Sequence, residues 1–362
     1  MMSLEWTGSK PGRKDGTRYA VGMREMGVAL AALLSNSIVC PAASLSSCES
    51  GAAKYTPCEL TFQWNKGEVP GEKSPYRDAL LNVEFRGPDS TTYLIHSFWD
   101  GSTHLRVRFV PNQAGTWTYR VTSEIHRLDN KEATFSVSDT ASAGYINVAN
   151  VRHWRSDDKK PHLWLAAEAP WLEMDANSFR TWVDSRKQDG FTHIRGVVLT
   201  QESSQSHPLV VSSQPNFAYF EALDDRLLYA HSQGFTLDLI LADHSFLQTG
   251  VLSRWADAEP LIRYVIARYG ALNVTWQGIE RFEEVGGSRT LLKQLFSSID
   301  RLDTYHHPRS TDARDTSSVL ARDGWETFII EASANPQCAA VEHQITTVPQ
   351  IHVIQSNEPD GF

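Results

Sequence analysis

The sequence predicts an N-terminal β-sandwich followed by an α/β barrel of the (β/α)8 type. Apolar and polar residues alternate at period two in the first third of the chain, whereas short apolar runs alternate with amphipathic helical patterns in the rest. The chain has 362 residues, of which 41% are hydrophobic and 21% are charged. This size and composition suit about two globular domains of roughly 150 residues each.

The charge balance excludes one class of partner. The chain carries 34 Lys and Arg against 43 Asp and Glu, a net charge of −9. No overall positive field gathers phosphate backbones, so we expect no nucleic-acid partner. Nothing in the composition indicates an oligomeric state.

Residues 1–45 form a predicted leader and signal-peptide region. The apolar stretch Gly27–Val39 follows Arg24 and precedes small residues, which is the layout of a signal peptide. The stretch is shorter than a membrane span requires, so we expect no transmembrane segment in the mature chain. Cleavage after Ser44 predicts a periplasmic or extracellular protein. The lipoprotein-like box Leu45–Cys48 predicts, as the alternative, a protein that is lipid-anchored at Cys48.

The cysteine pattern argues against a metal or redox site. Cys40, Cys48, Cys58 and Cys338 include no Cys-x-x-Cys pair. In an exported chain Cys48 and Cys58 can close a short disulfide loop, but a lipid on Cys48 would exclude that bridge. We expect no metal and no cofactor.

Residues 53–140 form the predicted sandwich. His104–Phe109 and Thr116–Thr122 each alternate apolar and polar residues, and the turn Pro111–Gly115 joins them into a hairpin. Several short strands within a hundred residues are typical of an antiparallel sandwich. The other expected strands are Cys58–Trp64, Ala79–Phe85, Thr92–Ile95 and Ala133–Val137.

Residues 145–362 form the predicted barrel. Its strands alternate with helices, which indicates parallel pairing through right-handed crossovers. No glycine-rich phosphate loop follows the first strand, so a barrel is favoured over an open dinucleotide-binding sheet. The expected strands are Leu163–Ala167, His193–Leu199, Leu237–Leu241, Val274–Gln277, His307–Thr311, Thr327–Glu331 and Ile351–Gln355. The expected helices are Phe179–Gln188, Phe220–Gln233, Glu259–Tyr269 and Leu291–Leu302.

Polar residues follow the carboxyl ends of these strands, where barrel enzymes place their chemistry. Two carboxylates across such a rim can serve as general acid/base and nucleophile on a glycosidic bond. The residues at the rim are Glu168, Gln201, Glu202, Asp243, His244, Glu280, Glu331 and Glu358.

Both regions contain distinctive sequence blocks. The blocks of the first region are Phe98–Gly101, Arg106–Phe109 and Ala114–Tyr119. The blocks of the second are Leu163–Trp171, Asp189–Thr192, Ala267–Ala271, Val274–Glu280 and His307–Thr311. Together these blocks resemble the apiosidase-like glycoside hydrolases, which carry an immunoglobulin-like domain before a clan-A type TIM barrel.

The resemblance implies a retaining two-carboxylate mechanism on a polysaccharide or oligosaccharide. Glu280 matches the position of the acid/base at the end of strand four, and Glu358 matches the nucleophile at the end of strand seven. Glu168 stands where the family usually has Asp. Substrate contacts are expected from Glu168, Trp171, Gln201, Asp243, His244 and Glu331.

Only seven barrel strands are expected before the chain ends at Phe362, so we expect a barrel truncated before strand eight. An unclosed barrel leaves unpaired strand edges, which makes activity the open question. Two alternatives to an exported glycoside hydrolase therefore stand. One is a catalytically inactive carbohydrate-binding protein, and the other is a structural envelope protein derived from a truncated glycosidase.

Overall fold

The computed structural model describes residues 45–69, 71, 73–169, 171–201, 207–210, 214–333 and 335–353. The expected leader up to residue 44 lies outside these residues, as do Glu202 and Glu358. Within the described part of the chain, no helix has the length and apolarity that a membrane span requires.

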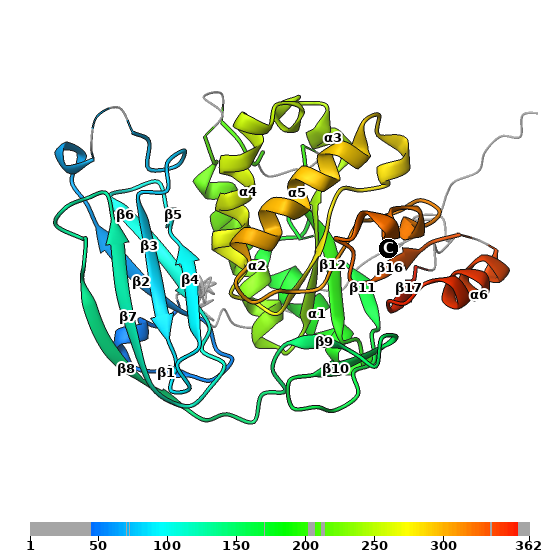
Figure 1. The fold of residues 1–362 in the computed structure, drawn as a ribbon, viewed down its shortest axis with the longest axis horizontal. Coiled ribbons are helices and arrows are strands. Elements are labelled where there is room, and N and C mark those ends of the chain that lie inside the picture. Colours follow the sequence, from blue (N-terminus) through cyan, green and yellow to red (C-terminus); the bar gives the residue numbers. More distant parts are fainter. Residues whose placement is uncertain are drawn as a thin grey trace, which may run out of the picture. The chain divides into compact units, whose positions relative to one another are not determined.

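The N-terminal region is rich in strands, which form two sheets (Figure 1). The larger sheet has the order β1-β8-β7-β3-β4, and the smaller one has the order β2-β6-β5. All pairs are antiparallel, as expected, except β1 with β8, which is parallel. The strands are β1 (Ala52–Ala53), β2 (Cys58–Gln63), β3 (Leu81–Arg86), β4 (Thr92–His96), β5 (Phe98–Trp99), β6 (His104–Phe109), β7 (Gly115–Ser123) and β8 (Glu132–Ser138).

One apolar core is shared by the two sheets of this region. In β7 the side chains of Trp117, Tyr119 and Val121 are buried while their neighbours are exposed, which confirms the alternation seen in the sequence. Phe85 of the larger sheet stacks on Phe109 of the smaller one, with ring centroids 3.9 Å apart. The expected hairpin of β6 and β7 is wrong, because these two strands belong to different sheets.

The second region is built around five parallel strands that curl into a half-barrel (Figure 1). Their order is β11-β12-β13-β14-β15, and a separate parallel pair is formed by β16 and β17. An antiparallel pair, β9 and β10, precedes them. The strands are β9 (Ile146–Ala149), β10 (His153–Ser156), β11 (Ala166–Glu168), β12 (His193–Leu199), β13 (Thr236–Ala242), β14 (Val274–Gln277), β15 (Arg309–Ser310), β16 (Ile329–Glu331) and β17 (Gln350–His352).

Helices connect successive parallel strands. Helix α2 packs on β13, α1 packs on α2, and α4 packs on α5. Asp175 caps α1, because its carboxylate accepts the N–H groups of Asn177 and Ser178. The helices are α1 (Ala176–Gln188), α2 (Phe217–Ser232), α3 (His244–Leu247), α4 (Trp255–Tyr269), α5 (Ser288–Leu302) and α6 (Pro336–Ile345).

All seven residues of β13 are buried, so this strand lies at the centre of the half-barrel core. At the edge, β11 begins three residues later than expected. Leu163 is 71% exposed, and the neighbouring Trp164 stacks instead on the ring of His193 at 3.9 Å. The apolar run that suggested a buried strand is therefore partly a surface segment.

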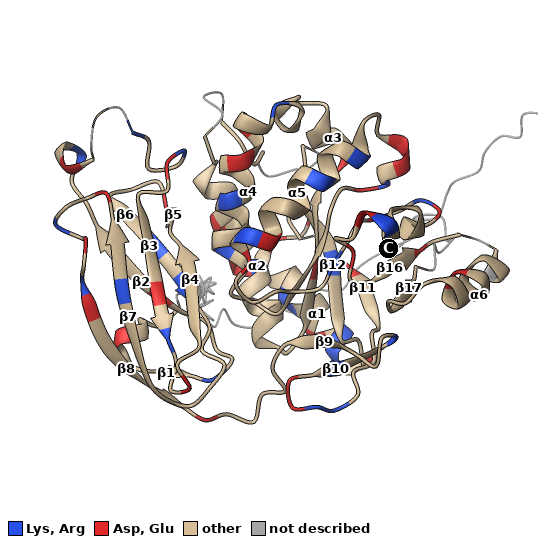
Figure 2. Cartoon of the chain, viewed as in Figure 1, with Lys and Arg blue, Asp and Glu red and all other residues tan. Residues whose placement is uncertain are grey.

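A buried ion network joins the strand-rich region to the helices of the half-barrel. Arg108 on β6 contacts Glu59 at 2.8 Å and Asp224 on α2 at 2.9 Å. Arg268 on α4 contacts the other oxygen of Asp224 at 2.8 Å. Both signs of charge also occur along α4 and α5 (Figure 2), where Arg301 reaches Glu259 at 3.5 Å.

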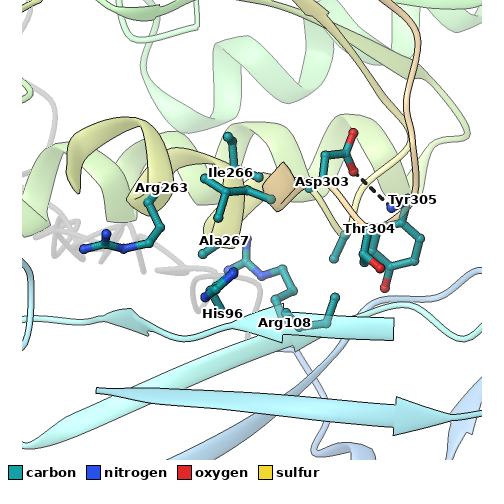
Figure 3. Close-up of a pocket in the computed structure, with 12 residues that line it drawn as sticks. His96, Arg108, Arg263, Ile266, Ala267, Asp303, Thr304 and Tyr305 are labelled. Atoms are coloured by element: carbon teal, nitrogen blue, oxygen red, sulfur yellow. Dashed lines mark hydrogen bonds between the residues drawn. The ribbon is translucent and has the colours of Figure 1, made fainter. Parts of the chain in front are cut away.

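A small cavity lies beside this network, between β4 and β6 on one side and α4 on the other (Figure 3). Its volume is about 20 Å³, and His96, Arg263 and Tyr305 are among its lining residues. Burial, together with the positive charges of Arg263 and Arg301, lowers the pKa of His96 to about 4. A space of this size suits a single water molecule rather than a sugar ring.

Candidate active site

The parallel strands of the half-barrel point the same way, so their carboxyl ends meet at one edge. Glu168 ends β11, and Asp243 directly follows β13. Glu280 lies three residues beyond β14, and Asp312 lies two residues beyond β15. Four residues with carboxyl groups therefore lie at or just beyond the strand ends of this edge, where barrel enzymes place their chemistry.

The backbone around Glu280 is tied to the neighbouring strand. Its N–H donates to the carbonyl of Ala242 at 2.9 Å. Ile279 and Ala242 form an isolated parallel bridge, which extends the pairing of β13 and β14 beyond the regular strand. The carboxyl group of Glu280 is thus carried by backbone that continues the sheet.

The surroundings of the half-buried Glu280 favour its protonated form. Burial raises the pKa of Glu280, and the negative charges of Asp312 and Asp243 raise it further. The charge of Arg281 and the backbone N–H of His244 act in the opposite direction. Because the net effect is a raised pKa, this carboxyl group is suited to donate a proton.

Arg195 and Asp312 form a buried ion pair at the same edge. Arg195 comes from the middle of β12, and its guanidinium contacts the carboxylate of Asp312. Its Nε donates to Oε1 of Gln277 on β14 at 2.9 Å. The N–H of Arg281 donates to the second oxygen of Asp312 at 2.9 Å. Side chains from β12 and β14 and the loop after β15 are thereby joined.

Asp243 caps the short helix α3. Its Oδ1 accepts the N–H of Phe246 at 2.8 Å and the hydroxyl of Ser245 at 2.7 Å. The same hydroxyl oxygen accepts the N–H of Gln201 at 2.8 Å. Among the expected substrate contacts, Asp243 is buried in this local network, whereas its neighbour His244 is exposed.

Glu168 and Trp171 lie in contrasting environments. The Glu168 side chain is 77% exposed, with its Oε1 3.9 Å from the Arg195 guanidinium. Trp171 is only 4% exposed and packs over Gly196, where an added Cβ would lie 2.2 Å from the indole Nε1. Trp171 thus packs in the core against β12, whereas Glu168 is open to solvent.

Comparison with known proteins agrees with this arrangement. The family model of the apiosidase-like catalytic domain matches residues 148–358, which is more than half of the chain. The chain belongs to the apiosidase-like family. A domain of unknown function, DUF5060, matches residues 51–124 in the strand-rich region. No curated protein matches the chain.

Solved structures similar to this apiosidase-like chain include one candidate glycoside hydrolase and two further carbohydrate-cleaving enzymes. The crystal structure of a candidate glycoside hydrolase from Bacteroides vulgatus ATCC 8482 superposes with a TM-score of 0.73 at 19% identity. That match covers 83% of this chain and 64% of the other, so the chain spans somewhat less than two thirds of its relative. At this identity the likeness concerns the fold.

Two further structures match less well. A glycoside hydrolase family 5 protein of the same organism has a TM-score of 0.49 at 16% identity, covering 59% of this chain and 54% of that one. The endo-1,4-beta-mannanase of Rhizomucor miehei has a TM-score of 0.46 at 11% identity, and the match covers 59% of this chain and 83% of the mannanase.

Glu331 of the apiosidase-like chain ends β16 and belongs to a second group of buried carboxyls. Burial and a hydrogen bond with Glu342 of α6 raise the pKa of Glu331 to about 7. Burial raises the pKa of the neighbouring Glu326 to about 8. The Glu342 carboxylate accepts the hydroxyl of Ser318 at 2.6 Å and the amide of Gln350 at 3.1 Å. Through Glu342, these contacts attach α6 to Ser318 and to Gln350 of β17.

Glu358, the predicted nucleophile, lies outside the described residues. Among the described residues, no three His, Cys, Asp or Glu side chains converge to hold a metal ion.

Sequence reasoning missed Arg195 and Asp312. Both carried a signal that could have revealed them. Arg195 is a charge inside the otherwise apolar run of β12, and a charge in a buried strand requires a partner. Asp312 directly follows the expected strand His307–Thr311, where the rule that selected the other rim residues applies equally.

Proposed function

We propose that this apiosidase-like chain is an exported glycoside hydrolase that cleaves poly- or oligosaccharides with retention of configuration. Glu280 is the acid/base and Glu358 the nucleophile. The observation that carries the proposal is the environment of Glu280. This carboxyl lies just beyond a parallel strand, is half-buried, and has a pKa that burial and the charges of Asp312 and Asp243 raise, which favours the protonated form that a general acid needs.

The reaction needs two carboxyls in opposite protonation states. In the first step the ionised Glu358 attacks the anomeric carbon while Glu280 gives its proton to the departing oxygen, so the glycosidic bond breaks and a glycosyl ester forms. In the second step the ionised Glu280 removes a proton from water, which attacks the same carbon and releases Glu358. Retention requires the two carboxyls to lie about 5–5.5 Å apart.

Two glutamates next to Glu280 serve a different purpose. The carboxylate of Glu283 accepts the N–H groups of Arg314, Asp315 and Thr316 at 2.9, 3.1 and 3.2 Å. Glu283 therefore holds the loop after β15. Glu284 forms an exposed ion pair with Arg314 at 3.5 Å. Glu284→Gln is thus a matched control, because it makes the same chemical change four residues from Glu280.

The test is hydrolysis of a panel of aryl glycosides and pectic oligosaccharides by the wild type, Glu280→Gln, Glu358→Gln and Glu284→Gln. We expect the first two variants to lose about 10²- to 10⁴-fold in rate on the oligosaccharides. The Glu284 control should retain the wild-type rate. Equal rates for the wild type and Glu280→Gln on the oligosaccharides would overturn the proposal. Glycan retardation in affinity electrophoresis without product release would support the carbohydrate-binding alternative.

We further propose that residues 53–140 form an immunoglobulin-like sandwich and that residues 145–362 belong to a domain of the TIM-barrel type. The shared core of two sheets supports the first assignment, and five parallel strands in a curled sheet support the second. Limited proteolysis should cut between residues 140 and 145 before it cuts within either region. Early cuts inside β12 or β13 would contradict these boundaries.

Export is supported by the disulfide between Cys48 and Cys58. Structural disulfides persist in oxidising compartments, and this one occupies the sulfur to which a lipid would be attached. We therefore propose a periplasmic or extracellular protein from which residues 1–44 are removed by cleavage after Ser44. The intact mass of the mature chain tests this, since retention of residues 1–44 or an added lipid would contradict it.

A further inference from the structure

We propose that Asp312 is the positioning residue of Glu280, which it holds through the backbone of Arg281 while Arg195 fixes its carboxylate. This inference rests on the proposed role of Glu280 as acid/base. Asp312 does not touch the substrate in this account. It acts on the proton donor by geometry and by charge.

The geometric part begins at Arg281, the residue that follows Glu280. Its backbone has φ of 42° and ψ of 56°, a left-handed conformation that side-chain-bearing residues rarely adopt. Such a conformation is unfavourable for a residue with a side chain and persists only where surrounding contacts impose it. The contact present is the hydrogen bond from the Arg281 N–H to Oδ2 of Asp312 at 2.9 Å. Asp312 thus stabilises the unusual turn that aims Glu280.

The loop is fastened to the end of β15 at two further points. The N–H of Phe282 donates to the carbonyl of Asp312 at 3.2 Å. The N–H of Ile279 donates to Oγ1 of Thr311 at 3.1 Å. A Cβ on Gly278 would lie 2.5 Å from that same oxygen, so the loop and the end of β15 are in close contact. Residues on both sides of Glu280 are therefore held by residues 311 and 312.

Arg195 orients Asp312 in turn. Its side chain is 11% exposed, and that of Asp312 is 9% exposed, so both charges are removed from most of the solvent. A buried charge without its partner costs several kcal/mol, which makes each of the two necessary for the other. The hydrogen bond from Arg195 to Gln277 at 2.9 Å fixes the guanidinium on β14, the strand that precedes the loop with Glu280.

The charge of Asp312 also decides how readily Glu280 gives up its proton. The charged groups that act on Glu280 are Asp312 after β15, Asp243 after β13 and its own neighbour Arg281. After burial, Asp312 is the largest cause of the raised pKa of Glu280. Removing that charge should lower this pKa. The alkaline limb of kcat/KM, where the acid loses its proton, should then move to lower pH.

Two substitutions separate the hydrogen bond that Asp312 makes with Arg281 from the negative charge of Asp312. Asp312→Asn keeps one acceptor oxygen for the Arg281 N–H and removes the charge, whereas Asp312→Ala removes both. We expect Asp312→Ala to lower kcat about 100-fold with little change in KM. Asp312→Asn should lose less than about tenfold below the alkaline limb, and this limb should move to lower pH. The control is Asp315→Asn, which changes an exposed residue of the same loop. It should leave kcat and the pH of the alkaline limb unchanged.

The decisive readout is direct titration of the Glu280 carboxyl by ¹³C NMR in protein labelled at glutamate, with the signal assigned by its loss in Glu280→Gln. Titration of Glu280 at lower pH in Asp312→Asn than in the wild type supports the proposal, and an unchanged titration overturns it. This outcome does not depend on activity. If no glycoside is cleaved, the proposed function fails while the titration still tests the role of Asp312.

A second variant guards against misfolding. Asp312→Asn combined with Arg195→Gln removes both charges together, so no unpaired ion stays buried. The circular dichroism of this double variant should match that of the wild type. The pKa of Glu280 should fall less than in Asp312→Asn, because loss of the Arg195 charge opposes loss of the Asp312 charge.

Discussion

The guanidinium of Arg108, on strand β6, lies 2.9 Å from the carboxylate of Asp224, on helix α2. The Arg108 side chain is 2% exposed and also contacts Glu59 and the carbonyl of Arg268. A residue of the strand-rich region is therefore ion-paired and hydrogen-bonded with two helices of the half-barrel. The first region supports the second by direct contact rather than by the linker alone.

Removal of Arg108 should destabilise the protein strongly. Arg108→Ala leaves Glu59 paired only with the more exposed Arg106 and Asp224 paired only with Arg268, and loss of such a buried partner costs about 3–5 kcal/mol in the free energy of unfolding. Urea unfolding followed by circular dichroism measures this change. The control is Arg120→Ala, which breaks an exposed pair with Glu132 at 3.4 Å and should cost less than about 1 kcal/mol. Equal losses for the two variants would contradict the network's role.

The buried Glu326 should make the protein less stable at alkaline pH. Its pKa is raised to about 8, so the folded state holds a proton that the unfolded state has released above pH 5. Stability therefore falls as the pH rises toward 8, by about 1.4 kcal/mol for each unit by which the pKa is raised. Glu326→Gln should raise the melting temperature at pH 8 relative to the wild type and change it less at pH 5.

The control for this prediction is Glu132→Gln on the exposed face of β8, which should leave the pH dependence of melting unchanged. If Glu326→Gln melts with the pH dependence of the wild type, the carboxyl is not protonated in the folded state. Glu331, whose pKa is raised to about 7, should also lower the stability of the folded protein as the pH rises, but over a lower pH range than Glu326.

Gly196 provides the space that Trp171 occupies. Gly196→Ala places a methyl group within 2.2 Å of the indole, so Trp171 must move or β12 must shift. We expect a loss of about 1–3 kcal/mol and a changed tryptophan emission spectrum. Gly67→Ala is the control, because nothing lies within 4 Å of its added Cβ. A Gly196 variant as stable as this control would show that the packing is looser than described.

The disulfide should contribute to stability through the loop it closes. Its cysteines are 10 positions apart, so replacing both with serine should lower the free energy of unfolding by about 2–3 kcal/mol. Mature protein should show one reactive thiol in denaturant, that of Cys338. Three thiols without prior reduction would mean that Cys48 and Cys58 are not bridged.

Local patterns predicted the elements well where neighbours in sequence decide the structure. The expected strands His193–Leu199 and Val274–Gln277 coincide with β12 and β14, because each is a short run of buried residues bounded by polar loops. Leu163 was misassigned because an apolar residue can lie on the surface, which no local pattern reveals. Strand ends thus predicted where Glu280 sits.

Contacts between distant residues could not be predicted in this way. Arg195 and Asp312 are 117 positions apart and meet only because β12, β13, β14 and β15 are adjacent in one sheet. The hydrogen bond of Glu331 with Glu342 likewise depends on how α6 folds back. Strand order and register decide such pairs, and a single sequence does not display them.

In the proposed mechanism Glu280 donates the proton to the departing sugar oxygen. The most direct test compares kcat/KM of the wild type and Glu280→Gln on aryl glycosides whose leaving groups span a wide range of pKa values. We predict a large loss for poor leaving groups and almost none for dinitrophenol, which leaves without protonation. A loss of the same size for every leaving group would contradict the claim, as would no loss at all.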